Sequence, residues 1–322
     1  MKTFTLLPVR SLAEGSRESA KPGSILKAGG VDLLDRMKEG LETPDRVISI
    51  AHVSGHDGIE IGPPASIGAL ATLARLDSHR ELRRIYPALA DAAGGAATPQ
   101  IRNMATLGGN LAQRPRCWYF RQAEFDCSKK GGDQCFALNG ENRFHAIFDT
   151  DVCCCIHPSA TAVALLAYGA RVNTVGAGGK RSIPIEEFFV APREDPTREN
   201  QLGPGEIIES VELPAPAPGS RSVYKKLKEK ESFDWPLVEA CVSVTMSGGS
   251  VQDSRVVLGS VSPVPRRVRG AEKILAGSRP SPELIARAAE AAVAGATPLS
   301  QNAHKVRLAR VMVERALREA LA

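Results

Sequence analysis

Six of the seven cysteines of the chain lie in one segment, Cys117–Cys155, and only Cys241 lies outside it. The first residues form an apolar stretch that is interrupted too soon for a secretory signal peptide, so we expect no export signal in the chain itself. Cysteines gathered in a long chain of this kind favour metal or redox chemistry over a framework of disulfide bonds. The segment is therefore the first candidate for a site of chemistry.

The spacing of these cysteines narrows the chemistry only in part. Nine, seven and seventeen residues separate four of them in turn: Cys117, Cys127, Cys135 and Cys153. Thiolates on long loops can converge on an iron–sulfur cluster. The CxxC pairs of zinc ribbons are absent, although His145 and His157 are available for a mixed cysteine–histidine zinc site. The spacing leaves three interpretations open, namely an iron–sulfur cluster, zinc, and inert or regulatory thiols.

Three cysteines follow one another at Cys153, Cys154 and Cys155. Because neighbouring side chains diverge, they are not expected to bind the same metal, and at least two of them are expected to be spare. Cys241 lies in an apolar stretch with strand character. We expect it to be a buried core residue, because free cysteine packs as a small apolar side chain.

Two glycine turns are suited to an anion. The first, Ala28–Asp32, separates a short apolar strand from a helix, and the second is Thr106–Asn110. Adjacent glycines permit positive φ and leave backbone N–H groups uncovered, which suits a phosphate. Either turn alone is weak evidence for a phosphate site, and neither is a GxGxxG fingerprint. Two such turns about 80 residues apart predict that both bind one diphosphate, from two sides.

Hydrophobic periodicity predicts the elements that position these residues. In the first 111 residues we expect strands at 4–8, 24–28, 46–50 and 58–61. The helices expected there are 11–20, 33–38, 67–73, 80–85 and 87–93. Ser11 and Glu14 have capping-box spacing at the start of the first helix. The first 50 residues thus read as a small βαβ unit.

The rest of the chain divides at a Pro-Ala segment. A buried helix at 160–168, a hairpin at 170–184 and a strand at 205–213 precede this stiff linker, residues 214–220. The strands expected after it are 222–228, 238–246 and 251–261, and the helices are 271–276, one opening at Ser281, and 305–321. Antiparallel strands followed by helices predict an α+β layout. We therefore place domains at 1–213 and 221–322.

The amino-acid composition and the absence of several motifs narrow the possible classes of function. The chain has 322 residues, 43% of them hydrophobic, and a formal charge of +5 spread over interspersed acidic and basic residues. These values predict a globular protein and give no support to nucleic-acid binding or to a membrane span. The GxSxG, HExxH and P-loop patterns are absent, so we predict no catalytic residue in this chain.

Taken together, the two glycine turns and the segment Leu258–Arg266 resemble the FAD-binding subunit of the molybdenum hydroxylases, the xanthine dehydrogenase and aldehyde oxidoreductase family. The resemblance implies a two-part FAD-binding domain of the vanillyl-alcohol-oxidase type, with parts at about 1–55 and 56–213. A C-terminal α+β domain with a three-stranded antiparallel sheet follows. The implied FAD-binding residues are Lys27, Ala28, Gly29, Gly30, Val31, Asp32, Leu33, Thr106, Gly108, Gly109, Asn110 and Lys226.

The cysteine segment resembles an insertion found in part of that family. Residues 114–156 look like the insertion in the flavin subunit of bacterial periplasmic-type aldehyde oxidoreductases, and more distantly of 4-hydroxybenzoyl-CoA reductase. In both, the insertion carries a [4Fe–4S] cluster. Anchoring on His157-Pro158-Ser159 implies four ligands: Cys117, Cys127, Cys135 and Cys153. The family usually has an aspartate after Pro-Ser that contacts the flavin side, whereas this chain has Ala160.

The resemblance also implies partners. Substrate is expected to react at a molybdenum cofactor in a large subunit, and electrons to pass through [2Fe–2S] clusters in a small subunit to FAD here. The assembly is expected to be a heterotrimer or a dimer of heterotrimers. It is expected in the cytoplasm, or in the periplasm if a partner carries the export signal. Two alternatives are a stand-alone flavoprotein oxidoreductase and a zinc-stabilised interaction module.

Overall fold

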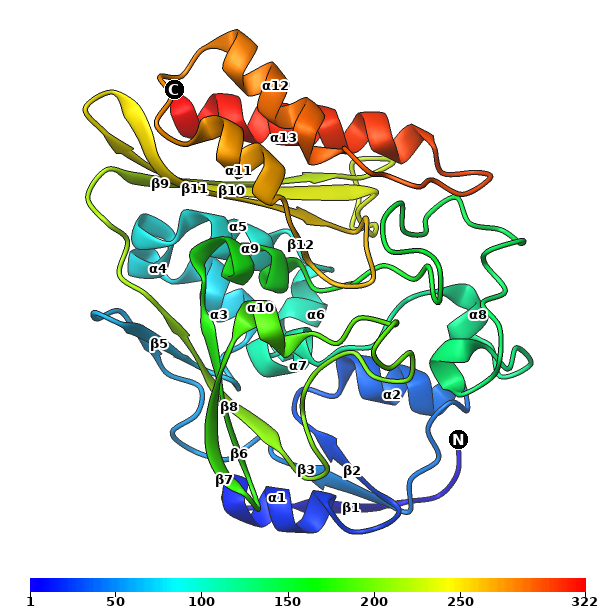
Figure 1. The fold of residues 1–322 in the computed structure, drawn as a ribbon. Helices are drawn as coiled ribbons and strands as arrows, with labels where there is room; N and C mark the ends of the chain where they lie inside the picture. The colour runs from blue at the N-terminus through cyan, green and yellow to red at the C-terminus, as the bar shows by residue number, and fades with distance from the viewer.

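The computed structural model describes all 322 residues. Three β-sheets and thirteen α-helices stack from one end of the molecule to the other, as Figure 1 shows. A small parallel sheet lies at the N-terminal end, a five-stranded sheet and a layer of helices follow, and a four-stranded sheet with three helices closes the C-terminal end. No helix has the length and apolar character required to cross a lipid bilayer.

The N-terminal part is the expected βαβ unit. Its elements are β1 (Thr5–Pro8), α1 (Leu12–Ser19), β2 (Ser24–Lys27), α2 (Val31–Lys38) and β3 (Arg46–Ser49). The strands are parallel in the order β1-β3-β2. Ser11 caps α1 by accepting a hydrogen bond of 3.1 Å from the Glu14 N–H, so the predicted capping residue is confirmed.

The second sheet is antiparallel in the order β4-β5-β8-β6-β7. Its strands are β4 (Ile59–Glu60), β5 (Ala65–Gly68), β6 (Arg171–Gly176), β7 (Gly179–Pro184) and β8 (Ile207–Leu213). The prediction of a helix at 67–73 is wrong. Ala65 and Ile67 are fully buried and alternate with less buried neighbours, which is the pattern of a strand, and β5 pairs with β8 far along the chain.

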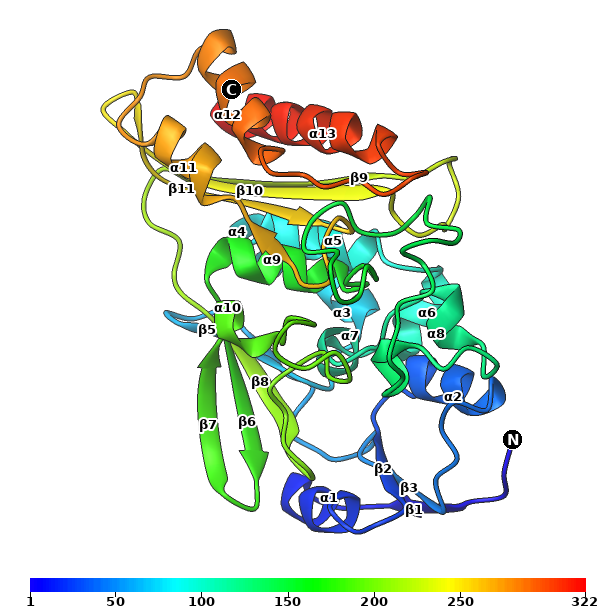
Figure 2. The same cartoon turned by 45° about the vertical axis from the view of Figure 1, so that its right-hand side comes forward.

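Helices fill the space between this sheet and the C-terminal one, as the turned view in Figure 2 makes plain. They are α3 (Leu73–Ser78), α4 (Arg80–Ile85), α5 (Pro87–Gly94), α6 (Pro99–Met104), α7 (Leu107–Leu111), α9 (Ala160–Tyr168) and α10 (Ile185–Phe188). The largest core, of 33 buried residues, lies in this layer. It includes nearly all of α9, whose Ala-rich sequence carries no polar face and is buried all round.

The C-terminal part has the expected antiparallel sheet and helices. Its elements are β9 (Ser220–Leu227), β10 (Val238–Ser247), β11 (Ser250–Gly259), β12 (Arg266–Arg267), α11 (Arg269–Leu275), α12 (Pro282–Ala292) and α13 (His304–Leu321). Three long strands match the prediction, and the two-residue β12 adds a short edge. One face of the sheet packs on α11–α13 in a second core of 26 residues, and the other face meets α5 and α9. The α+β class is confirmed.

Residues 114–156 form an irregular insertion beside these layers. Their only regular elements are α8 (Trp118–Arg121) and one turn of 3₁₀-helix, η1 (Ser128–Lys130). The segment runs from the neighbourhood of α2 up to the C-terminal sheet along one side of the molecule (Figure 1). There the Ile147 and Phe148 N–H groups both donate to the Val261 carbonyl, at 2.8 and 3.1 Å. The insertion thus bridges the two ends of the fold.

Candidate functional site

A cavity of about 510 Å³ lies where the N-terminal unit, the helical layer and the C-terminal sheet meet. Its wall includes most of the residues predicted to bind the cofactor: Lys27, Ala28, Gly29, Gly30, Val31, Asp32, Leu33, Thr106, Gly109, Asn110 and Lys226. Gly108 is not part of the wall. Segments separated by about 200 residues in the sequence thus line one space.

The first glycine turn presents the N-terminus of α2 to this cavity. Gly30 is the N-cap residue with φ of 80°, and no side chain caps the helix. The N–H groups of Gly29, Gly30 and Val31 donate no hydrogen bond within the chain. These free donors, together with the positive end of the helix dipole, form an anion site that suits a phosphate group.

Gly29 also fixes how this turn meets the segment before the second one. A Cβ atom at Gly29 would lie 1.8 Å from the backbone oxygen of Met104. That distance is far inside van der Waals contact, so only glycine fits here. The turn therefore rests directly on the backbone that leads into Thr106–Asn110.

The second glycine turn packs closely against the segment that follows β5. It is the first turn of α7, where the Gly108 N–H donates to the Ala69 carbonyl at 2.9 Å and the Gly109 N–H donates to the Thr106 hydroxyl at 3.2 Å. Its N–H groups are thus occupied within the chain, and a Cβ at Gly108 would lie 3.0 Å from the Ala69 side chain. The turn packs tightly on the segment after β5, while Thr106, Gly109 and Asn110 line the cavity.

The Asn110 side chain connects α7 to the start of α9. Its Oδ1 atom accepts hydrogen bonds from the Ser159 hydroxyl at 2.7 Å and the Thr161 hydroxyl at 2.6 Å. Ser159 in turn caps α9 by accepting from the Ala162 N–H at 3.1 Å. The amide therefore fixes the start of α9 against α7, where Pro158 and Ala160 line the same cavity.

Asp32 is the centre of a group of arginines at the base of the insertion. Its carboxylate accepts from Arg36 at 3.2 Å and from Arg121 at 2.7 Å, and it pairs closely with Arg116. The Arg114 N–H donates to it at 3.1 Å. Burial opposes its charge, but the arginines more than offset this and lower the pKa of Asp32.

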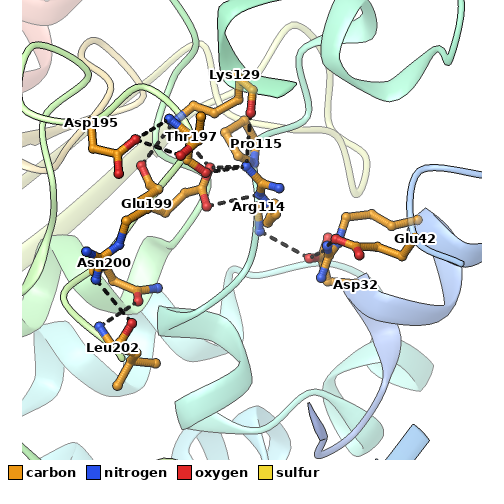
Figure 3. Close-up of polar contacts among 12 residues, drawn as sticks. Asp32, Glu42, Arg114, Pro115, Lys129, Asp195, Thr197, Glu199, Asn200 and Leu202 are labelled. Carbon is orange, nitrogen blue, oxygen red and sulfur yellow. Dashed lines mark hydrogen bonds and ion pairs between the residues drawn. The ribbon is translucent and has the colours of Figure 1, made fainter. Parts of the chain in front are cut away.

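Arg114 connects Asp32 and the insertion to a third segment of the chain, the one around Glu199. Figure 3 shows its guanidinium facing Glu199 while its backbone N–H points to Asp32. Glu199 receives Arg114 at 3.0 and 3.1 Å and also lies 3.2 Å from Lys129, a lysine that is 3% exposed. Two inserted cations thus share one buried carboxylate, so the segment around Glu199 holds the base of the insertion in place.

The insertion gathers most of its thiols at one place. The Cys135 Sγ lies 3.5 Å from the Cys154 Sγ, and hydrogen bonds from the Cys153 and Cys154 thiols lower the pKa of Cys135 to about 2. The Cys117 Sγ lies 3.2 Å from the His145 Nε2, and burial raises its pKa to about 12. This is a concentrated set of soft donors of the kind that iron–sulfur clusters use.

Two details differ from the predicted ligand set. Cys154, expected to be spare, lies inside the thiol group against Cys135. Cys127 is buried, and its backbone bridges to Gln134 beside Cys135, but its thiol makes no hydrogen bond with another cysteine. No three His, Cys, Asp or Glu side chains are arranged to hold a single metal ion. The donor chemistry fits a polynuclear cluster, whose ligands need not converge on one atom.

Aromatic side chains and a neutral histidine surround the thiols. Trp118 lies edge-on to His145 with ring centroids 5.0 Å apart, and Tyr119 packs on Phe125 and Phe136. Burial lowers the pKa of His145 to about 4, so its imidazole is neutral near pH 7. Cys241 is fully buried in the main core, as predicted, away from this group.

Arg116, Trp235 and Glu239 are among the residues of the cavity wall that sequence reasoning missed. The Arg116 guanidinium lies over the Trp235 ring at 5.1 Å, and its Nε is buried without a partner. Glu239 is 1% exposed. Its signal in the sequence was a lone carboxylate within an apolar strand, which is unusual because buried acids need partners.

Comparison with known proteins places the chain in a family. A family model described as "FAD binding domain in molybdopterin dehydrogenase" matches residues 4–216, and "CO dehydrogenase flavoprotein C-terminal domain" matches residues 222–320. The chain therefore belongs to the FAD-binding medium subunits of the molybdenum hydroxylase family, which are parts of oxidoreductases.

Individual relatives cover almost the whole chain. The aldehyde oxidoreductase FAD-binding subunit PaoB of Escherichia coli (strain K12) is 36% identical over 329 residues, which cover 100% of this chain and 99% of the relative. The carbon monoxide dehydrogenase medium chain of Hydrogenophaga pseudoflava is 30% identical, covering 92% and 89%. A solved structure of carbon monoxide dehydrogenase from that organism matches with a TM-score of 0.77 at 28% identity, covering 98% of this chain and 96% of the other.

Proposed function

We propose that this protein is the electron-transfer subunit of a molybdenum-dependent aldehyde oxidoreductase or related hydroxylase, with FAD in the cavity described above. The observation that carries the proposal is the uncapped N-terminus of α2, whose free N–H groups face a cavity shared by both parts of the fold. A diphosphate needs such donors, and the turn has no Cβ atoms at Gly29 and Gly30 to obstruct it. Both features fit the FAD that the family binds.

The residues of the chain bind and orient the cofactor rather than react with substrate. Bound flavin supplies the exchange between two-electron and one-electron transfer. Lys226, whose ammonium donates to the Gly95 carbonyl at 2.8 Å, places a positive charge at the end of the cavity under the C-terminal sheet. Burial lowers the pKa of this lysine. No group positioned as a general acid or base for an organic substrate is required in this chain.

The thiol group of the insertion is proposed to hold a [4Fe–4S] cluster. The proposed ligands are Cys117, Cys127, Cys135 and Cys153. Support comes from the gathering of soft donors, the neutral histidine beside Cys117 and the aromatic shell that excludes water. Such a cluster would lie next to the arginines around Asp32, and hence next to the cofactor cavity.

The partners are proposed by analogy with the relatives. PaoB is named as the FAD-binding subunit of an aldehyde oxidoreductase, and the Hydrogenophaga relative as a medium chain. We infer a large molybdenum-cofactor subunit that oxidises substrate and a small [2Fe–2S] subunit that passes electrons to the flavin. The assembly is a heterotrimer or a dimer of heterotrimers, in the cytoplasm or exported by a partner's signal.

Quantifying flavin and metal in the purified complex tests this proposal. We expect one FAD per copy of this chain, and about four Fe beyond those of the small subunit's [2Fe–2S] clusters. Flavin absorption with a broad iron–sulfur shoulder near about 400 nm is expected. One zinc and no iron beyond that of the small subunit would replace the cluster by a structural zinc site, and a complex without flavin would overturn the flavin assignment.

Single cysteine substitutions test the ligand register. Cys153→Ser is expected to lose the iron of the insertion, because serine removes one of four thiolate ligands. Cys154→Ser and Cys155→Ser are matched controls in the same stretch of chain and are expected to keep it. Iron content and the absorption near about 400 nm are the measurements. Loss of iron in Cys154→Ser with retention in Cys153→Ser would shift the register by one residue.

A further inference from the structure

Glu239 is a buried carboxyl at the end of the cavity that lies under the C-terminal sheet. It is 1% exposed and lines the cavity together with Lys226. The two residues are direct partners in the antiparallel ladder of β10 and β9, so their side chains emerge on the same face of the sheet. That face continues into the main core through Tyr224 and Cys241, whereas Val223 and Ala240 point to the opposite core.

Two hydroxyl groups orient this carboxyl. The Tyr224 hydroxyl donates to its Oε1, and the Ser260 hydroxyl donates to its Oε2 at 2.8 Å. Because each carboxylate oxygen can accept two hydrogen bonds, both oxygens keep acceptor capacity after these contacts. The nearby cations are Lys226 and Lys305, and the Lys305 ammonium is already bound to three carbonyls, including that of Ser260 at 2.7 Å. Neither lysine donates to the Glu239 carboxylate, so the lysines do not fill its remaining acceptor capacity.

The carboxyl also lies against the start of α9. A Cβ at Gly259 would be 2.7 Å from the Glu239 Oε2 and 2.5 Å from the Val163 side chain, so these two groups are close neighbours. Val163 lies one helical turn from Ala160, which lines the same cavity. Glu239 thus brings a carboxyl to the part of the cavity wall near Ala160.

We propose that Glu239 is a cofactor-binding residue, whose carboxylate accepts a hydrogen bond from the bound flavin beside the ammonium donor of Lys226. The donor is either the imide N–H of the ring or a hydroxyl of the ribityl chain, the two kinds of donor on the oxidised ring and ribityl part of FAD. This inference rests on the proposed flavin function. An isolated carboxyl is costly to bury in an apolar core, and a polar ligand group at the cavity offsets that cost.

Measuring the affinity for FAD distinguishes a flavin-binding role of Glu239 from a purely structural role within the protein. In the flavin-stripped complex, the dissociation constant of FAD is expected to rise about 10- to 100-fold in Glu239→Ala and less in Glu239→Gln, which keeps an acceptor oxygen but no charge. Cys241→Ala is the matched control, because Cys241 is a buried residue two positions from Glu239 on the same face of β10 and does not line the cavity. It is expected to change the dissociation constant less than about threefold.

The outcomes distinguish the inference from the function on which it rests. If wild type and both Glu239 variants bind FAD equally well, Glu239 is a structural residue and the inference is wrong. If the wild type itself binds no FAD, the proposed function fails instead. The Tm of the flavin-stripped Glu239→Gln complex, expected at or above that of the wild type, shows that the loss is not unfolding.

A modified cofactor identifies the donor. Binding of FAD methylated at the imide nitrogen is compared in wild type and Glu239→Ala. If the imide donates to Glu239, methylation weakens binding to the wild type and has little further effect on the variant, because both changes remove the same contact. If methylation weakens both equally while Glu239→Ala still weakens unmodified FAD, the ribityl chain is the donor.

Discussion

Replacing Gly29 by alanine is expected to empty the flavin site. The new Cβ would lie 1.8 Å from the Met104 carbonyl oxygen and 2.9 Å from its carbon. Both obstructing atoms are backbone, so no rotamer change relieves the clash, and the turn must move away from the segment that supports it. The free N–H groups at the start of α2 then no longer point into the cavity. The affinity for FAD is therefore expected to fall about 100-fold or more.

The measurement for Gly29→Ala is flavin content after purification, together with titration of the apoprotein with FAD. Gly178→Ala is the matched control, since a Cβ at Gly178 meets nothing within 4 Å. It is expected to retain full flavin content. If Gly29→Ala keeps FAD at the wild-type level, the contact between the turn and Met104 does not position the phosphate site.

The two glycine turns have similar sequences but differ in whether their backbone N–H groups are hydrogen-bonded within the chain, and this difference shows what a local sequence pattern can predict. The first turn follows a strand and opens a helix, so its free N–H groups are a consequence of residues adjacent in the sequence. The second turn looks similar, but its Leu107 and Gly108 N–H groups donate to the carbonyls of Ala71 and Ala69 after β5. Those partners depend on how α7 packs against a distant segment, which a local pattern does not reveal.

Charged residues show the same difference between local motifs, which the sequence reveals, and contacts between distant residues, which it does not. The predicted residues of the cavity wall came from a family resemblance to contiguous motifs, and all but Gly108 line the cavity. The Asp32–Arg116 pair and the Tyr224–Glu239–Ser260 contacts join residues 84, 15 and 21 positions apart. Charge and hydroxyl residues at such separations are too common for sequence alone to pair them. Likewise, the position of Cys154 against Cys135 depends on the path of an irregular loop with few regular elements.

Replacing Asp32 by alanine is expected to be the most destabilising change at the base of the insertion. Arg36, Arg116 and Arg121 would lose a shared counter-charge in a region where Arg121 is 9% exposed. Removing one partner of a buried ion pair costs about 3–5 kcal/mol, because the remaining charge is left buried without compensation. Denaturant unfolding measures this loss, and limited proteolysis between residues 114 and 156 reports whether the insertion loosens first.

The pH dependence and a control make the Asp32→Ala prediction specific. The folded-state pKa of Asp32 lies below its ordinary 3.8, so its stabilisation is present above that pH and is lost as the pH falls below it. The difference in unfolding free energy between wild type and Asp32→Ala should therefore shrink in acid. Asp45→Ala breaks an exposed pair with Lys2 and is expected to leave the unfolding midpoint unchanged. Equal midpoints for Asp32→Ala and wild type at neutral pH would mean that Arg121 holds the insertion without Asp32, through its other partners Asp35 and Glu39.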